Sequence, residues 1–496
     1  MNSAAAPDRL APASDSLALL RHPGTIRARC RAVLDAVSDE RSAWFRVDRA
    51  RLADVAARVA ALTRKRFPDL NVPPHSRWRH FEAGGVNRRA ELEARLAGRS
   101  ALEAARARID LAFVSVLLDA GAGPAWRYAD NDGQRYSRSE GLGVASFRAF
   151  VGGRFSSQAS DPLRADATAL ARIDAAALGD IFQVGPDNPM VGLEVAALLA
   201  RLGTVLLGAR MALGGGPQGP QGPQRPGQLL ERLGVPGPTP GGEAGGLPAS
   251  GEAGEVPAMR VSAATLLQQV LALTDGIFMQ GTPVMGRGVG DVWAHRFAGT
   301  KVAGGGTDPV TAGVVPFHKL SQWLCYSLLE PLAWAGIEVA DEDAAAGLTG
   351  LPEYRNGGLL LDAGVIVPRQ ASLAERRFKP GDEAVVEWRA LTVALLDELA
   401  PRVREQLGRS ESELPLAAIL EGGTWAAGRE IALESAPAAR RRWPSRATAR
   451  CFERSARHLI SCTGHCRADG PLHPGHHDSS EGPCACGLTA VTTRAA

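Results

Sequence analysis

The sequence predicts a mainly α-helical protein with a single large helical domain and a few short β-strands. Apolar residues recur at spacings of three and four over long stretches, which is the pattern of helices with one buried face. Ala and Arg, both good helix formers, are used heavily. Hydrophobic residues make up 45% of the 496 residues and charged residues 22%, so a sizeable core can form.

Helical periodicity begins near residue 28 and continues to about 65, where Leu52, Val55, Val59 and Leu62 recur on one face. A helix from about 138 is indicated by Ser137-x-x-Glu140, which resembles a capping box. The remaining helices are predicted over 89–120, 190–213, 259–276, 316–334 (interrupted by Pro331), 382–407 and 412–420.

Irregular segments separate these helices. Pro73–Pro74 and Gly84–Gly85 mark residues 66–88 as a loop, and residues 281–313 are Gly-rich. Within 353–368, the apolar run LLLDAGVIV after a Gly-Gly turn predicts a short pair of strands.

Composition divides the chain into a central domain and looser parts. Residues 1–20 are predicted to be flexible, residues 21–433 to form the domain, and residues 434–496 to form a divergent, disordered tail. Residues 214–257 are a Gly/Pro-rich insertion with three Gly-Pro-Gln triplets, interpreted as a flexible loop with one helical turn at Leu229–Leu233.

Charge and hydropathy exclude several function classes. The 56 basic and 53 acidic residues nearly balance, so no general footprint for nucleic acid is present. No run of 18 apolar residues predicts a membrane span, and the first residues lack the pattern of a secretory signal. Only Cys30 and Cys325 precede residue 450, which favours a cytoplasmic protein without disulfides.

No cofactor and no metal are predicted. The tail holds five Cys residues as well as His465, His473, His476 and His477, but Cys462-x3-Cys466 and Cys484-x-Cys486 fit known zinc spacings poorly. GRGVGD (286–291) has a Gly-x-Gly-x-Gly form without the strand before and the helix after that a dinucleotide site needs.

The stretch 316–334 carries the richest set of polar residues. Lys319, Trp323, Tyr326 and Glu330 form one stripe that could line a polar pocket, and His318 lies on another face. The alternative is an amphipathic helix with a snorkelling Lys.

A second candidate group is LPEYRNGGLLLDAGVI, which places Glu353, Arg355, Asn356 and Asp362 around the Gly-Gly pair. Arg suits bidentate binding of phosphate or carboxylate, and a carboxylate in an apolar run must be paired or have a shifted pKa. The alternative is a hairpin turn with one satisfied Asp.

Three further groups are weaker candidates. Glu387 and Arg389 lie near the start of the 382–407 helix, where Glu also suits the helix dipole. Trp126 and Tyr128 suit stacking on a planar ligand and core packing equally well. HSRWRH (75–80) is a compact cationic group that suits an anion, or a solvated loop.

Several stretches together resemble the uracil-catabolism proteins of the fungal-type uridine-degradation route. The resemblance runs from about residue 20 to 433. It rests on PPHSRWRHFEAGG (73–85), VSVLLDAGAGPAWRY (114–128), RSEGLGVASFRAF (138–150), FQVGPDNPMVGLE (182–194), VPFHKLSQWLCYSLLEPL (315–332), LTGLPEYRNGGLLLDAG (348–364) and LEGGTWAAGR (420–429).

The resemblance implies a pathway in which a pyrimidine nucleotide is opened and urea is released through ribosylurea-type intermediates. Members usually end, soon after the GGTWAAGR segment, with a Pro-rich stretch and Asp-Gly-Thr-Val-Phe. Here the Cys/His tail replaces that end, and the 214–257 insertion is expanded. If the missing residues complete the pocket, this copy is impaired.

A weaker similarity is to queuosine-salvage nucleotide glycosylases, which implies a DNA-glycosylase-like helical fold. GDVWAHR, the 316–334 stretch and EWRAL occur in a similar order. Those enzymes use an Asp early in the comparable helix, where this sequence has His318 and Lys319.

The leading hypothesis is therefore an N-glycoside hydrolase that releases urea from ribosylurea or its 5′-phosphate, a small nucleoside-derived substrate. Alternatives are amide or ureido hydrolysis of a ring-opened nucleotide, or a non-catalytic partner of the ring-opening enzyme. The expected catalytic residues are Asp362, Glu353, Glu387 and His318, and the expected substrate-binding residues are Arg355 (for a phosphate), Asn356, Trp126, Tyr128, Lys319 and Arg389.

Overall fold

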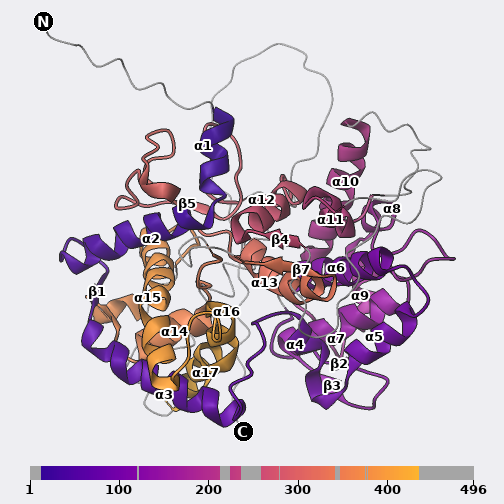
Figure 1. Ribbon diagram of the computed structural model, residues 1–496, viewed down its shortest axis with the longest axis horizontal. Coiled ribbons are helices and arrows are strands. Elements are labelled where there is room, and N and C mark those ends of the chain that lie inside the picture. The colour runs from indigo at the N-terminus through magenta and orange to yellow at the C-terminus, as the bar shows by residue number, and fades with distance from the viewer. Residues whose placement is uncertain are drawn as a thin grey trace, which may run out of the picture. The chain divides into compact units, whose positions relative to one another are not determined.

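Helices dominate the computed structural model, which confirms the predicted mainly α fold (Figure 1). The structure describes residues 13–119, 122–212, 224–235, 259–278, 280–340, 347–374, 376 and 378–434. The Cys/His-rich tail and most of the 214–257 insertion lie outside these residues. Within them, no helix is both long and apolar enough to span a membrane.

Most of the longer helices follow the predicted stretches. The longer helices are α1 (Ala13–Leu20), α2 (Pro23–Ser38), α3 (Leu52–Arg66), α5 (Arg88–Leu96), α6 (Ala101–Leu117), α7 (Arg138–Val151), α9 (Ala175–Ile181), α10 (Ala196–Ala212), α12 (Ala263–Leu273), α13 (Lys319–Trp334), α14 (Tyr354–Asp362), α15 (Glu383–Leu407) and α17 (Trp425–Glu434). Of these, α1, α9, α14 and α17 lie outside the predicted helices. Single turns form α4 (Trp78–Phe81), α8 (Ala167–Leu170), α11 (Leu229–Arg232) and α16 (Leu416–Ile419). The turn predicted at Leu229–Leu233 is confirmed by α11.

The strands are two or three residues long and pair two by two. Antiparallel pairs join β1 (Phe45–Val47) to β8 (Ile366–Pro368), β2 (Tyr128–Ala129) to β3 (Arg135–Tyr136), and β5 (Val292–Ala294) to β6 (Val314–Pro316). The parallel pair is β4 (Met259–Val261) with β7 (Ile337–Val339).

Local signals divide one predicted helix into two. The stretch 89–120 contains α5 and α6, because Gly98 adopts a left-handed φ of 81° between them. Ser100 then caps α6 by accepting a hydrogen bond from the Glu103 amide. Near the N-terminus, part of the stretch expected to be flexible forms α1, because Leu17 and Leu20 are buried in a small apolar cluster with Val284.

The strand pair predicted within 353–368 is wrong. Most of this segment is helix α14, and only Ile366–Pro368 forms a strand. The Gly-Gly pair is not a turn: a Cβ at Gly357 would lie 3.0 Å from the side chains of Trp388 and Thr392, so glycine lets α14 approach α15 closely. The helix ends where Gly364 adopts a φ of 75°.

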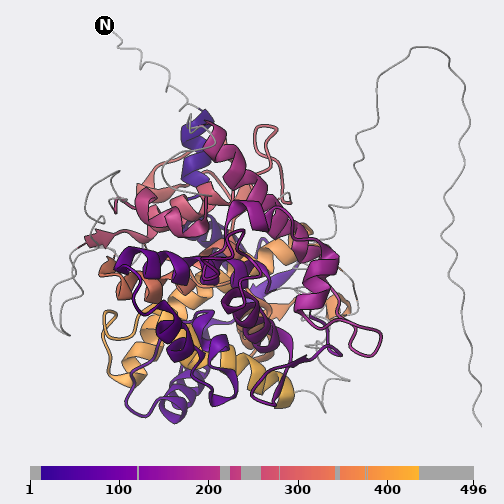
Figure 2. The same ribbon diagram turned by 90° about the vertical axis from the view of Figure 1, so that its right-hand side faces the viewer.

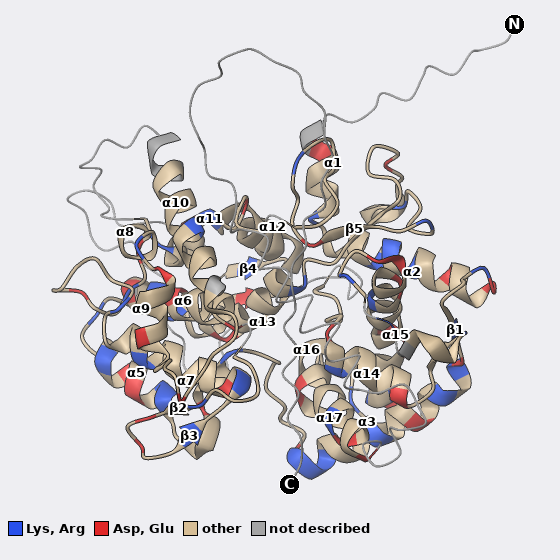
Figure 3. Ribbon diagram, turned by 180° about the vertical axis from the view of Figure 1, so that it is seen from behind, with Lys and Arg blue, Asp and Glu red and all other residues tan. Residues whose placement is uncertain are grey.

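The core is built from helix pairs that are distant in sequence. α15 packs against α2 and α3, and α14 packs against α17 (Figure 1). α13 packs against α6 and α12, while α10, magenta in Figures 1 and 2, packs against α8. Both basic and acidic residues lie on the outer helix α5 (Figure 3).

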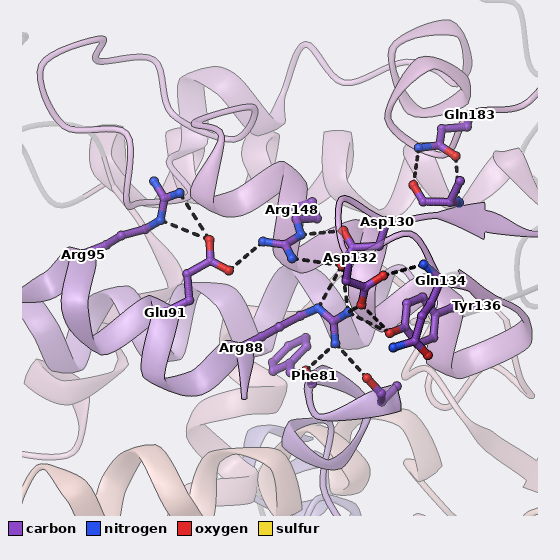
Figure 4. Close-up of polar contacts among 12 residues, drawn as sticks. Phe81, Arg88, Glu91, Arg95, Asp130, Asp132, Gln134, Tyr136, Arg148 and Gln183 are labelled. Atoms are coloured by element: carbon purple, nitrogen blue, oxygen red, sulfur yellow. Dashed lines mark hydrogen bonds and ion pairs between the residues drawn. The ribbon is translucent and has the colours of Figure 1, made fainter. Parts of the chain in front are cut away.

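A buried ionic network fixes α5, the β2–β3 hairpin and α7 to one another (Figure 4). Arg88 donates to Asp130 at 2.7 Å and to Asp132 at 2.8 Å, and its side chain is fully buried. Arg148 of α7 donates to the same Asp130 at 2.6 and 2.9 Å. Burial alone would raise the pKa of Asp130, but these two arginines lower it to about 2. The network holds the last turn of α7 in place.

Candidate functional site

A cavity of about 610 Å³ lies where segments from most of the chain converge. Its walls come from the α1–α2 junction, the 73–85 loop, the ends of α6 and α12, and the start of α7. The segment before β5, the starts of α13, α14 and α15, and Trp425 of α17 complete it. Its volume suits a small-molecule ligand.

Glu353 presents a carboxylate with unused hydrogen-bonding capacity in the cavity wall. It is the N-cap residue of α14 but makes no side-chain capping bond. Its Oε2 lies 3.8 Å from Lys319 Nζ, and its buried Oε1 has no hydrogen-bond partner among the described residues. The Lys319 ammonium in turn lies 5.5 Å from the ring centre of Trp323. A ligand can therefore still bind to this carboxylate.

His75 and Glu421 form a dyad beside Glu353. The Nδ1 atom of His75 lies 2.9 Å from Glu421 Oε2, and Glu421 belongs to a short π-helix, Leu420–Thr424. Burial alone would lower the pKa of His75, but the hydrogen bond to Glu421 and the charge of Glu353 raise it. With Nδ1 on Glu421, the protonated imidazole can donate from Nε2, and His75 lines the cavity.

Asp291 and Arg389 form a bidentate ion pair in another part of the wall. The two guanidinium nitrogens lie 2.8 and 2.7 Å from the carboxylate, which also accepts from Trp293 Nε1 and from the Lys319 amide. Burial opposes ionisation, but Arg389 holds the pKa of Asp291 well below its usual range. The pair ties the segment before β5 to α15 and to the first residue of α13.

The cationic 75–80 loop is largely engaged with carboxylates of the protein itself. Arg77, fully buried, donates to Asp119 at 2.8 Å, and Arg79 donates to Glu330 at 2.6 Å. Burial and the charge of Arg77 lower the pKa of His80 to about 3, so this imidazole is neutral at physiological pH. Of the loop, His75 and His80 line the cavity.

His318 lines the cavity in a strained conformation. It precedes α13 with a φ of 46° and a ψ of 40°, which non-glycine residues seldom adopt. Its Nε2 lies 3.2 Å from the Leu20 carbonyl oxygen, and burial lowers its pKa to about 4. The imidazole is thus neutral near pH 7 and poorly suited to donate a proton there.

Four of the ten predicted site residues line the cavity: Glu353, His318, Lys319 and Arg389. The catalytic candidates Asp362 and Glu387 do not. Asp362 lies at the far end of α14 from Glu353, where burial raises its pKa to about 6. Glu387 is 1% exposed, lies 3.4 Å from His295 and accepts a hydrogen bond from Ser42.

The other four predicted residues make packing and structural contacts outside the cavity. Arg355 stacks on Tyr354 and Trp425, with 4.6 and 5.5 Å from its guanidinium carbon to the ring centres. Asn356 donates to the Leu351 carbonyl and accepts from Thr424. Trp126 is fully buried and donates to the Phe182 carbonyl, and Tyr128 pairs with Tyr136 in the β2–β3 hairpin.

Sequence reasoning missed several residues of the wall. Asp119, Asp291 and Arg138 were not singled out, and His75 was noted only as part of a cationic loop. Glu421, which contacts His75 but does not itself line the cavity, was not singled out either. Each lies in a segment with an identifiable signal: Asp291 ends GRGVGD, and Glu421 precedes the Gly-Gly pair of LEGGTW. No spacing rule joins these segments, since His75 and Glu421 are 346 positions apart.

The chain is similar to a known family over most of its length. The family model described as "Protein of unknown function (DUF1688)" matches residues 19–444. Protein urg3 of Schizosaccharomyces pombe is 35% identical over 430 residues, which cover 86% of this chain and 96% of that protein. Uracil catabolism protein 4 of Lachancea kluyveri is 33% identical over 444 residues, covering 83% and 93%. The family match includes every cavity wall.

Proposed function

We propose that this chain, which belongs to the DUF1688 family, takes part in uracil catabolism by hydrolysing the N-glycosidic bond of ribosylurea or its 5′-phosphate. The pathway is supported by the name of the relative called uracil catabolism protein 4. The reaction is supported by the chemistry of the cavity wall.

Cleavage of an N-ribosyl bond passes through an oxocarbenium-like state, which needs a nearby carboxylate and an acid for the leaving nitrogen. Glu353 is the carboxylate: it stabilises the developing positive charge and takes a proton from the attacking water. His75 donates a proton to the leaving nitrogen as the C–N bond breaks. Water adds to the anomeric carbon, and the products are urea and ribose or ribose 5-phosphate.

The observation that carries this proposal is the pairing of Glu353 with the His75–Glu421 dyad. Glu353 Oε1 is buried without a partner among the described residues, so the carboxylate can accept a proton or contact a cationic centre. The raised pKa of His75 keeps more of the imidazole protonated than usual near neutral pH. An acceptor and a donor therefore lie in one cavity.

The test is mass-spectrometric product analysis of the purified chain with ribosylurea and with ribosylurea 5′-phosphate. The wild type should release urea, and Glu353→Gln should lower the rate by about 10²- to 10⁴-fold. Asp362→Asn should keep most of the activity, because this carboxylate lies outside the cavity. The opposite ranking of the two variants would return the catalytic role to Asp362.

Other products would support the alternative functions. Ammonia in place of urea, with the glycosidic bond intact, would indicate ureido or amide hydrolysis of a ring-opened nucleotide. Unchanged substrate, with no binding of either compound, would indicate a non-catalytic partner of the ring-opening enzyme. Either result would refute N-glycoside hydrolysis.

A further inference from the structure

All but one of the Asp, Glu, Lys and Arg side chains that line the cavity form an ion pair with another described residue. The four lining carboxylates each have a cation: Asp275 pairs with Arg21 at 2.9 Å, Asp291 with Arg389 at 2.7 Å, Asp119 with Arg77 at 2.8 Å, and Glu353 with Lys319 at 3.8 Å. Three of the four lining cations are thereby matched. The fourth, Arg138, has no ion pair or hydrogen bond from its guanidinium among the described residues.

Arg138 is also exposed and held in an unusual backbone conformation. It is the first residue of α7 and has a φ of 54°, which costs free energy for a residue with a long side chain. The next residue, Ser139, is fixed because its carbonyl accepts from the buried Arg77 at 3.1 Å, and the Arg148 network anchors α7 farther along. Arg138 is therefore an unpaired cation on a rigid support at the mouth of the cavity.

We infer that Arg138 binds the phosphate of a phosphorylated substrate, so that the ligand of this cavity is a ribosyl 5-phosphate compound and not the free nucleoside. The inference rests on the proposed function for the sugar. Ribosylurea itself carries no charge, whereas its phosphate carries about −1.5 to −2 near pH 7. A planar guanidinium offers two parallel donors to such a group.

This assignment moves the phosphate contact from Arg355, which the sequence suggested, to Arg138 at the start of α7. Arg355 lies against the rings of Tyr354 and Trp425 and does not line the cavity. Arg138 and the Glu353–His75 pair then contact different parts of one ligand. The phosphate is held at the exposed mouth, and the glycosidic bond lies at the less exposed carboxylate, whose side chain is 12% exposed.

Calorimetric titration of the full chain with ribose 5-phosphate and with ribose tests the inference without any turnover. The wild type should bind ribose 5-phosphate about 10- to 100-fold more tightly than ribose, as expected for one charge-assisted contact. Arg138→Asn, a residue that tolerates positive φ, should remove this preference, and Arg138→Lys should keep part of it. The preference should also shrink as salt rises, because the site is exposed.

Arg135→Asn is the matched control, because Arg135 is an exposed arginine of β3 that does not line the cavity. Equal affinity for both sugars in the wild type, or a preference that survives Arg138→Asn but not Arg135→Asn, would overturn the inference. Acetate that competes as well as inorganic phosphate would reassign the group to a carboxylate. Failure of urea release from both substrates would refute the proposed function and leave this binding comparison intact.

Discussion

Two clusters of charged residues in this protein, the Arg88 network and the cavity wall, differ in whether their buried polar atoms all have hydrogen-bond partners. In the network of Arg88, Asp130 and Arg148, no buried side-chain polar atom lacks a partner (Figure 4). In the cavity wall, Glu353 Oε1 and Trp323 Nε1 are buried and have no hydrogen-bond partner among the described residues. The number of charges is similar, so it does not distinguish a site from a structural support. These two clusters differ instead in their unused hydrogen-bonding capacity.

The largest expected effect comes from breaking the closed network at its centre. Asp130→Asn should lower the free energy of unfolding by about 3–5 kcal/mol, because two buried arginines lose their shared carboxylate. Denaturant titration followed by circular dichroism measures this change. Asp54→Asn, which removes a 3.7 Å pair with Arg51 at an exposed position, is the control and should change it by less than about 1 kcal/mol. Equal losses of unfolding free energy in Asp130→Asn and Asp54→Asn would show that the buried network is no stronger than the exposed ion pair.

The neutral histidines of the cavity wall should make stability depend on pH. The folded-state pKa of His318 is about 4, below the ordinary value of 6.5, so the unfolded chain binds a proton first as the pH falls. This contribution is complete above pH 6.5 and about 2 kcal/mol of it is lost by pH 5. His318→Asn, which tolerates the positive φ, should therefore show a shallower decline of the unfolding free energy between pH 7 and 5. An unchanged slope would contradict the pKa shift.

The His75–Glu421 dyad should set the alkaline limit of activity. Glu421→Gln removes the carboxylate that raises the pKa of His75, so the proton donor is lost at a lower pH. The descending limb of the pH–rate profile should move to lower pH, and the rate on that limb should fall accordingly. A profile that keeps its position while the rate falls evenly would indicate that Glu421 only supports the fold.

The smallest expected effect lies at the rim of the closed network. Glu91 pairs with Arg148 at 2.6 Å and with Arg95 at 3.2 Å, but its side chain is 31% exposed. Glu91→Gln should lower the unfolding free energy by only about 0.5–1 kcal/mol. Comparison with Asp130→Asn in the same titration shows whether burial sets the strength of the network. A loss as large as that of Asp130→Asn would show that it does not.

The helices could be predicted because their signals are local. α13 and α15 follow from apolar spacing, and α6 lies within the helix predicted over 89–120. The segment 353–368 was misread because a Gly-Gly pair indicates a turn unless a partner helix is known. Gly357 instead fits beneath Trp388 of α15, a contact that no local pattern contains.

Residues of the candidate site could be predicted only where they lie on a helix or at its N-cap. Lys319 and His318 adjoin in sequence, and Glu353 stood out as one of the polar residues around the Gly-Gly pair. The dyad of His75 and Glu421 depends on the packing of α3 against the π-helix, where Gly423 has room for no side chain beside Val59. That Arg138 has no carboxylate partner among the described residues likewise could not be predicted from the sequence. It becomes apparent only when the ion pairs of the other charged lining residues are known from the fold.

The cavity draws its walls from Arg21 to Trp425, and this has a consequence for biosynthesis. A ribosome must release nearly the whole domain before the complete cavity can form. The substrate therefore cannot bind to a partly synthesised chain and stabilise its fold. A small molecule bound in the cavity would contact both the α1–α2 junction and the first residue of α17. At 100 times its dissociation constant such a ligand would stabilise the entire fold by about 2.7 kcal/mol. Metabolite supply would then influence how long each copy survives in the cell.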